Sequence, residues 1–323
     1  MAILKTSAIG LPATTITAGA KEELLPLLTN LDKKKKAALF LWLPKGSAAS
    51  LMPEWFVDTL AATAAAAVVE GTYFAASATE TLSARTRYRN IVQAIRRDFD
   101  VSMDEVVLSQ HGQVAGVQNE WDYQVEKKGM EVIQSFDARL TQTANADMDA
   151  TNRYMRNLRG WASASGLATN VSGAFVTDKF VALQEAMFNT GADPDTLLVS
   201  PGVKLDVTQA FMNDAGKARV QYTQPISEVY DMSVDYIRTD LGRVAIIVDR
   251  FMPQTASTAT DGSASMGSYF LFEREALQLL FFRPIKQYTL PQSGDGFNGY
   301  VHGSCTLRVA HASQVGHGYN ITT

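Results

Sequence analysis

The clearest periodic pattern in the chain is a stripe of apolar residues between Asn119 and Ala144. Apolar side chains recur there at steps of three and four residues, which places them on one face of a helix. The pattern therefore predicts one long amphipathic helix whose apolar face packs in a core. The stripe consists of Trp121, Val125, Val132, Ile133, Phe136 and Leu140.

Three shorter segments also have helical patterns. Residues 21–28 and 32–42 are expected to be helical, the second with Asp32 as its N-cap and Pro44 as its stop. Residues 176–189 form the third, which the following sequence GADP ends.

Runs of apolar residues between these segments predict strands. Gly242 can adopt a positive φ without steric cost, so the Asp240-Leu241-Gly242 sequence indicates a hairpin. Pro284 is expected to stop a strand, and Pro201 suits the first residue of a short helix. Strands and helices do not alternate regularly, which favours an α+β fold. The expected strands are 196–200, 232–238, 243–249, 268–272, 277–282 and 297–310.

Residues 53–105 allow two interpretations. Propensity favours a helix over the alanine-rich stretch 61–69, whereas its valines and the following Gly71 also suit a strand. Arg85, Arg87 and Arg89 have the spacing of a strand, which would place all three guanidinium groups on one face.

Several short motifs, taken in order, resemble the major capsid proteins of tailed bacteriophages. The C-terminal half has TDLG at 239–242, VDRFM at 248–252, LFFRP at 280–284 and SGD at 293–295. Upstream, the same order continues with LPKG at 43–46, Glu54-Trp55, VVEG at 68–71, EKKG at 126–129 and RYMRNLRGW at 153–161. The weight lies in their order and spacing, since none of them is specific alone.

The resemblance implies an α+β tailed-phage major capsid fold with an N-terminal arm, an extended two-stranded loop, a peripheral domain with a long spine helix, and an axial domain. Glu54–Glu70 and Leu82–Phe99 would form the two arms of the loop. The implied divisions are 1–52 for the arm, 53–105 for the loop and its flanking strands, 106–171 for the peripheral domain, 172–290 for the axial domain, and 291–323 for a strand returning to the peripheral domain and the C-terminus.

The function implied by the resemblance is self-assembly into hexamers and pentamers of an icosahedral virion shell that encloses double-stranded DNA, formed in the host bacterial cytoplasm. Scaffolding, portal and decoration proteins would be further partners. Another phage structural protein, such as a tail-tube or decoration subunit, is the main alternative, and a hydrolase is a weaker one. The candidate inter-subunit contacts are Arg85, Arg87, Arg89, Arg96, Arg97, Glu70, Trp42 and Trp55, with Gly242 as a structural turn.

Composition narrows the possible functions. The formal net charge is −4, from 29 basic and 33 acidic residues, whereas a protein that grips nucleic acid through phosphates usually has a positive excess. Cys305 is the only cysteine, so no intrachain disulfide is possible, and it is expected to be a small buried side chain. No run approaches the ~20 apolar residues of a membrane span, so no membrane segment is expected.

Motifs for chemistry are nearly absent. Gly294, Gly296 and Gly299 match the spacing of a dinucleotide-binding loop, but a strand-like run follows them, so turn glycines are the better interpretation. The histidines lack zinc-ligand spacing, and carboxylates near Asp98 are expected to pair with Arg96 and Arg97. No catalytic residue, metal site or cofactor is expected.

Some members of the resembled family lock their shells with isopeptide bonds from a loop lysine to a neighbour. No lysine occurs between Gly46 and Glu126 in this chain. Its loop carries arginines instead, and a guanidinium stays protonated and is a poor nucleophile. A shell held only by non-covalent contacts is therefore predicted.

Overall fold

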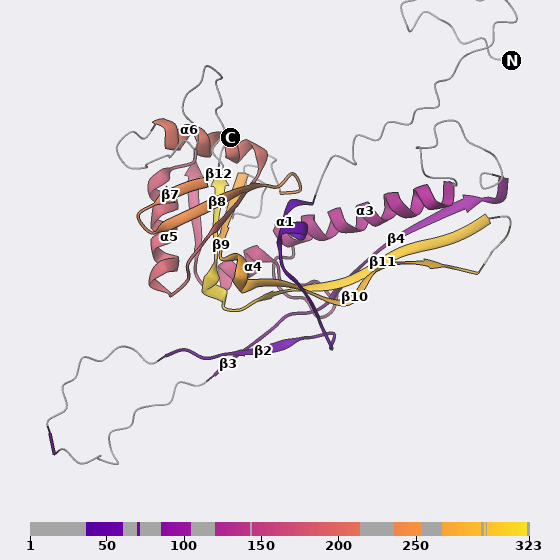
Figure 1. Cartoon of the computed structure of the whole chain (residues 1–323), viewed down its shortest axis with the longest axis horizontal. Coiled ribbons are helices and arrows are strands. Elements are labelled where there is room, and N and C mark those ends of the chain that lie inside the picture. Colours follow the sequence, from indigo (N-terminus) through magenta and orange to yellow (C-terminus); the bar gives the residue numbers. More distant parts are fainter. Residues whose placement is uncertain are drawn as a thin grey trace, which may run out of the picture.

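The computed structural model describes residues 37–60, 70–71, 85–104, 120–142, 144–213, 236–252, 267–291, 294 and 296–321. These residues form two sheets, a separate hairpin and the helices around them (Figure 1). The predicted helix 21–28, residues 32–36 of the predicted helix 32–42, the alanine-rich stretch 61–69 and His111 lie outside the described residues.

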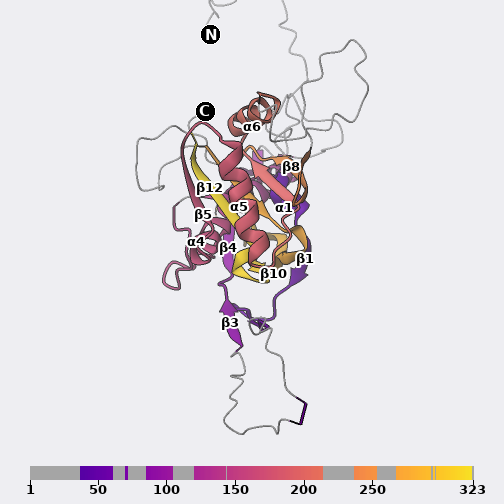
Figure 2. The same ribbon diagram turned by 90° about the vertical axis from the view of Figure 1, so that its left-hand side faces the viewer.

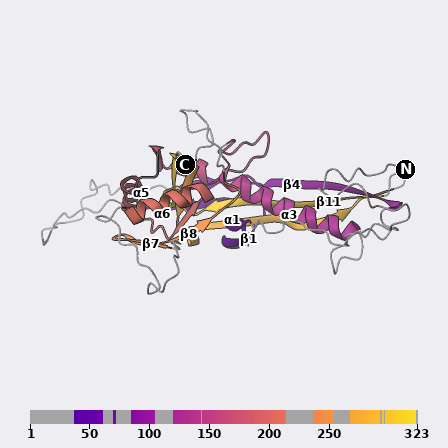
Figure 3. The same ribbon diagram turned by 90° about the horizontal axis from the view of Figure 1, so that it is seen from above.

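A four-stranded sheet supports the long helix. Its strand order is β1-β10-β11-β4, with β1 parallel to β10 and the other neighbours antiparallel. Helix α3 (Glu120–Thr141) lies lengthwise along this sheet, as Figure 3 shows from above. The predicted long helix is thereby confirmed. The strands are β1 (Lys45–Ser47), β4 (Gln93–Ser102), β10 (Leu277–Thr289) and β11 (Gly296–Val309).

Alternation of side chains explains how α3 packs on this sheet. Phe99 of β4 and Val301 of β11 point to the helix and join the same core as Phe136 and Leu140 of α3. At the far end, the ring of Trp121 lies 4.7 Å from that of Phe99. It fits there because Gly299 has no side chain: a Cβ would come within 2.6 Å of the indole.

A six-stranded sheet forms the other half of the molecule. Its order is β5-β12-β9-β6-β8-β7, with β5–β12 and β6–β8 parallel. Figure 2 shows α5 (Thr177–Asn189) lying across this sheet, with α6 (Pro201–Asn213) nearby. The strands are β5 (Ala168–Gly173), β6 (Thr196–Val199), β7 (Tyr236–Thr239), β8 (Gly242–Val248), β9 (Gly267–Phe272) and β12 (Val315–Ile321).

The central strands of this sheet are buried on both faces, as expected for strands covered on each side. Leu197 and Val199 face α5 and α6, whereas Leu198 faces the core shared with α3. In β9, Tyr269 likewise faces α5 and α6, and Phe270 faces the core shared with α3. The six-stranded sheet is thus the wall between two cores. Helix α4 (Leu158–Ala164) and the short helix α1 (Ala38–Trp42) contribute to the shared core.

One predicted strand limit is wrong. Pro284 does not stop β10, which continues to Thr289. The register with β11 is irregular between Arg283 and Lys286, and β1 pairs with β10 only as far as Phe281. Proline, which has no N–H to donate, is accommodated at such irregular, unpaired edges. Strands β5 and β12 were not predicted.

The predicted second arm of the loop, Leu82–Phe99, belongs to two different elements. Strand β3 (Thr86–Arg89) pairs antiparallel with β2 (Glu54–Val57) in a two-stranded hairpin. Strand β4 then begins at Gln93 and joins the four-stranded sheet. Strands β3 and β4 are separate because the side chain of Asn90, which lies between them, points inward. It donates to the carbonyl oxygens of Arg156 and Leu307.

Two strands join sheets with partners that are distant in the sequence. Strand β10 pairs with β11 and with the N-terminal β1 in the four-stranded sheet. The C-terminal β12 is in the six-stranded sheet between β5 and β9, at a distance in sequence from its neighbours. Contacts between strands far apart in the chain decide both placements.

Candidate inter-subunit surface

The β2–β3 hairpin projects from the body of the molecule, as Figure 1 shows. Trp55 anchors it: this side chain is only 9% exposed and lies on the face of β2 that meets the body. Its ring centroid is 5.8 Å from that of Trp161 in α4 and 6.5 Å from that of Tyr88 in β3. Trp55, a predicted inter-subunit contact, therefore packs within its own subunit.

The opposite face of the hairpin is exposed where the structure describes it. Phe56, next to Trp55 but on the opposite face, is 69% exposed, and Leu60 is 99% exposed. Exposed apolar side chains are ordinary when single, but here they sit on a projecting ribbon with little core of its own. A two-stranded ribbon is marginal in water by itself, so this one gains stability from whatever it lies against.

The arginines of the hairpin are exposed and lie on one face of it. Arg85 Nε is 3.4 Å from Asp58 Oδ2, and Arg87 Nη1 is 3.4 Å from Glu54 Oε2. Arg89, also exposed, directly opposes Glu54 in the strand register. The predicted common face is thus present, but two of the three guanidinium groups pair across their own hairpin.

Glu70 lies in an exposed turn together with Gly71, whose φ is +83°. A positive φ favours glycine at this position. The described residues show no side-chain contact for Glu70.

The face of the four-stranded sheet opposite α3 is polar. Arg96 forms an ion pair with Asp98 at 2.6 Å, and its guanidinium carbon lies 4.9 Å from the ring centroid of Tyr300. Tyr300 in turn stacks on Tyr288 at 5.2 Å. Burial, followed by the positive charges of Arg283 and Arg96, lowers the pKa of His302. The Arg96–Asp98 pairing expected from the sequence is confirmed.

Arg97 lies on the opposite face from Arg96 because neighbouring strand residues alternate. Its Nη2 donates to Ser135 Oγ of α3 at 3.0 Å. Trp42 occupies the end of α1 and is 37% exposed. The guanidinium of Arg274 lies 4.4 Å from its ring centroid, and Arg274 Nε donates to its carbonyl oxygen.

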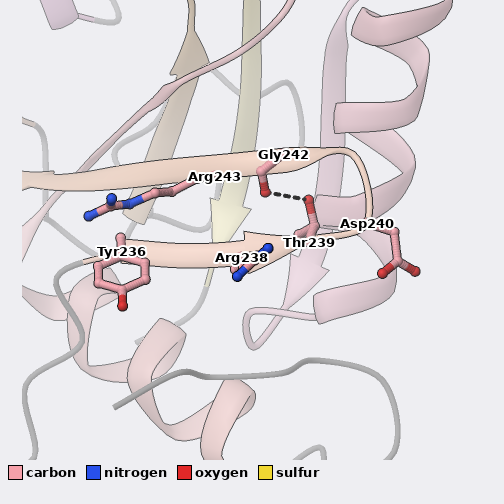
Figure 4. Close-up of a pocket in the computed structure, with 6 residues that line it drawn as sticks. All are labelled: Tyr236, Arg238, Thr239, Asp240, Gly242 and Arg243. Atoms are coloured by element: carbon pink, nitrogen blue, oxygen red, sulfur yellow. Dashed lines mark hydrogen bonds between the residues drawn. The ribbon is translucent and has the colours of Figure 1, made fainter. Parts of the chain in front are cut away.

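The β7–β8 hairpin borders a shallow hollow (Figure 4). Gly242 begins β8 with a φ of +141°, which confirms the predicted hairpin and its glycine. Thr239 Oγ1 donates to the carbonyl oxygen of Gly242 at 3.3 Å, and the Arg243 guanidinium lies 4.0 Å from the Tyr236 ring centroid. These groups form an open polar surface and include no nucleophile with an adjacent base.

Most of the described side chains that could act in catalysis or bind a metal have a structural role instead. No cluster of three or more potential metal ligands occurs among the described residues. Cys305 is fully buried, as predicted, and burial raises its thiol pKa. His317 is buried against Phe270 at 4.5 Å, and burial lowers the pKa of His317 to about 3. Gly294 has the positive φ of a turn, whereas Gly296 and Gly299 lie in β11.

Sequence reasoning missed several polar residues at the centre of the subunit. Arg139 of α3 donates to the carbonyl oxygens of Ala144, Asn145 and Met155. Asp137 and Asp249 are buried side by side, although the sequence places them more than a hundred residues apart. Only the repeated occurrence of charged residues within apolar runs could have drawn attention to them. No described helix is both long and apolar enough to cross a membrane.

Solved structures that are similar to this chain include phage capsids and an encapsulin. The SrpI encapsulin of Synechococcus elongatus PCC 7942 matches with a TM-score of 0.62 at 11% identity, covering 100% of this chain and 97% of that one. The capsid of cyanophage P-SCSP1u matches at 0.58 and 14%, covering 100% of both chains. Gordonia phage Cozz matches at 0.60 and 10%, covering 100% and 99%. At such identities these matches establish the fold.

The family follows from the sequence as a whole. No curated protein matches the chain. The family model described as SU10 major capsid protein matches residues 10–322, which is nearly the whole chain. The chain therefore belongs to the SU10 major capsid protein family, and it is a shell-forming capsid protein of a bacteriophage.

Proposed function

We propose that the chain assembles into hexamers and pentamers of an icosahedral virion shell around double-stranded DNA, and that the β2–β3 hairpin is the element that joins neighbouring subunits. In this proposal the hairpin is the extended loop, the four-stranded sheet with α3 is the peripheral domain, and the six-stranded sheet is the axial domain. Assembly takes place in the host cytoplasm, with scaffolding, portal and decoration proteins as further partners.

The observation that carries the proposal is the contrast between the two faces of the hairpin. Trp55 fixes its root to the body, whereas Phe56 and Leu60 expose apolar surface on the projecting part. Burying apolar surface is favourable by about 25 cal/mol per Å². A neighbouring copy that covers this ribbon therefore gains stability without changing the fold of the subunit.

The mechanism is the multiplication of moderate contacts. A standard protein interface buries roughly 1,600 Å² in total, and a subunit in a closed shell makes several such contacts. Closed symmetry turns individually weak contacts into a stable particle. This function requires no catalysis, and we propose that the chain is not an enzyme.

Replacing the exposed apolar side chains of Phe56 and Leu60 tests the proposal. The variant Phe56→Ser/Leu60→Ser removes exposed apolar surface, so the monomer should keep its melting temperature while shells fail to form or form at much higher protein concentration. Sedimentation and negative-stain microscopy measure assembly. The control Phe56→Leu keeps an apolar side chain and should assemble. Normal shells from the double serine variant would rule out the hairpin as a joining element.

The three exposed arginines of the hairpin give a second test. The triple variant Arg85→Glu/Arg87→Glu/Arg89→Glu should impair assembly and leave the monomer folded, whereas single changes should be mild because exposed charges mainly steer association. Because two of these arginines also pair with Asp58 and Glu54, a control is needed.

The control restores pairing within the hairpin. Adding Asp58→Arg and Glu54→Arg to the triple variant re-creates the internal ion pairs with reversed sign. If the arginines act on a neighbour, assembly should remain impaired. Full recovery of assembly would show that they act only inside their own hairpin.

A further inference from the structure

Two aspartates meet in the interior at the junction of α1, α3 and the six-stranded sheet. Asp137 lies in α3 and Asp249 directly follows β8, and both side chains are 0% exposed. The backbone N–H of Asp249 donates to the carbonyl oxygen of Val199, which ties it to β6 of the six-stranded sheet. Phe40, from the short helix α1, packs beside Asp137.

In each carboxyl group, one oxygen accepts a hydrogen bond from a backbone N–H group. The Phe40 N–H donates to Asp137 Oδ1 at 2.6 Å, and the Leu39 N–H also bonds to this carboxyl. The Phe251 N–H donates to Asp249 Oδ1 at 3.0 Å. These bonds orient both side chains and leave the second oxygen of each directed elsewhere.

The second oxygens have no donor among the described residues. Asp137 Oδ2 and Asp249 Oδ2 are buried and receive no hydrogen bond from any N–H or hydroxyl group that the structure describes. The two side chains are nevertheless within hydrogen-bonding reach of each other. Two ionised carboxylates have acceptors only, so a bond between them requires a proton on one of them. One shared proton satisfies both orphaned oxygens and removes one of two buried negative charges.

We propose that Asp137 and Asp249 share a single proton and form a pH-sensitive latch that holds α1 and α3 against the six-stranded sheet. With the proton present, the pair is a hydrogen bond across the junction. When the proton passes to solvent, two negative charges face each other in the interior, and the contact between the three parts is weakened.

The charged side chains on the elements around the two aspartates contact other groups in the described structure. On α3, Arg139 bonds to carbonyl oxygens beyond the end of the helix. Near α1, Lys45 lies over the Phe40 ring at 5.2 Å and Arg274 lies on Trp42. Arg250, next to Asp249, is exposed. The charge that acts on the pKa of Asp137 is that of Asp249.

Burial first, and then the charge of Asp249, raises the pKa of Asp137 to about 8, and burial also raises the pKa of Asp249. An unfolded aspartate has a pKa of about 3.9. The folded state therefore holds a proton that the unfolded state lacks between about pH 4 and 8. By linkage, the stability given by the proton is complete at low pH, falls as the pH rises to about 8, and changes no further above that.

The experiment measures the unfolding equilibrium of the full-length, unassembled chain from pH 5 to 9.5, beside Asp137→Asn and Asp249→Asn. Each asparagine can accept the same backbone N–H and donate its Nδ2–H to the remaining carboxylate, so it mimics the shared-proton state permanently. The unfolding constant of the wild type relative to either variant should rise about tenfold per pH unit up to pH 8 and then level off. Parallel pH curves would overturn the proposal.

The double variant Asp137→Asn/Asp249→Asn is the matched control. If both oxygens keep their backbone donors, two NH₂ groups then face each other, and no bond can form between them. Its unfolding constant should exceed the product of the single effects by about tenfold or more. Additive effects would contradict a direct bond. A wild-type melting temperature that rises with added calcium or magnesium would show a bridging cation instead and would also overturn the proposal.

Amide hydrogen exchange separates a latch from a general change in stability. The protection factors of the Leu39 and Phe40 amides should fall as the pH rises to about 8 and then level off in the wild type, whereas in Asp137→Asn they should not. Equal losses across the whole chain would show that no local contact is released. Because all of these measurements use the single subunit, their outcome is independent of whether the hairpin joins subunits.

Discussion

Gly242 holds the β7–β8 hairpin in a backbone conformation that other residues resist, with a φ of +141°. Space is not the constraint, since nothing lies within 4 Å of where its Cβ would be. Gly242→Val should therefore lower stability by about 1–3 kcal/mol through backbone strain alone. Thermal or urea unfolding of the unassembled chain measures this.

The same substitution in α3 is the control for that prediction. Gly129 also has open space at its Cβ position, but its φ is not positive. Gly129→Val should change stability by less than about 0.5 kcal/mol, because valine and glycine have similar helix propensities. Equal effects at the two sites would mean that strain at Gly242 is negligible.

Single polar residues in the interior could not be predicted. Asn90 bridges Arg156 and Leu307, which are 66 and 217 positions away. Asp137 and Asp249 likewise acquire their roles only from each other. A local pattern shows that a polar residue interrupts an apolar run, but its partner depends on the complete fold.

Among the elements, the β2–β3 hairpin depends on one aromatic anchor. Trp55→Ala should cost about 3–5 kcal/mol, because it removes a large side chain from contact with Tyr88 and Trp161. Phe56→Ala, one residue along and 69% exposed, should cost less than about 0.5 kcal/mol. Chemical denaturation of both variants compares them. A similar loss from each would refute the assignment of opposite roles to the two faces.

The predictability of each element follows from how local its signal is. Helices α3 and α5 and strand β6 have strong periodic or apolar patterns, and their predictions are confirmed. Strand β12, with sequence VGHGYNI, has no such pattern. Two of its positions are glycines, because Gly316 and Gly318 leave space for the side chains of Met187 and Tyr269. The continuation of β10 through Pro284 depends on an edge that only the assembled sheet creates.

For the whole molecule, the order of short motifs was sufficient to predict the capsid fold, and the family match agrees with it. The order of strands in space was not predictable in the same way. Strand β12 lies between β5 and β9, and β10 lies between β1 and β11, so each sheet combines distant segments. The candidate inter-subunit contacts stay a prediction: the hairpin arginines are exposed, whereas Trp55 is an internal anchor.

The shell as a whole should be held only by non-covalent contacts. The region from Gly46 to Glu126 has no lysine to act as a nucleophile, and its arginines stay protonated. Cys305 is buried in β11 between β10 and β4, so its sulfur cannot reach a neighbouring subunit without opening the sheet. Mature particles boiled in denaturant, with or without reductant, should give one band near 35.2 kDa on a gel. A ladder of multimers that resists reductant would demonstrate cross-links by another chemistry, and a ladder removed by reductant would show that Cys305 becomes exposed during assembly.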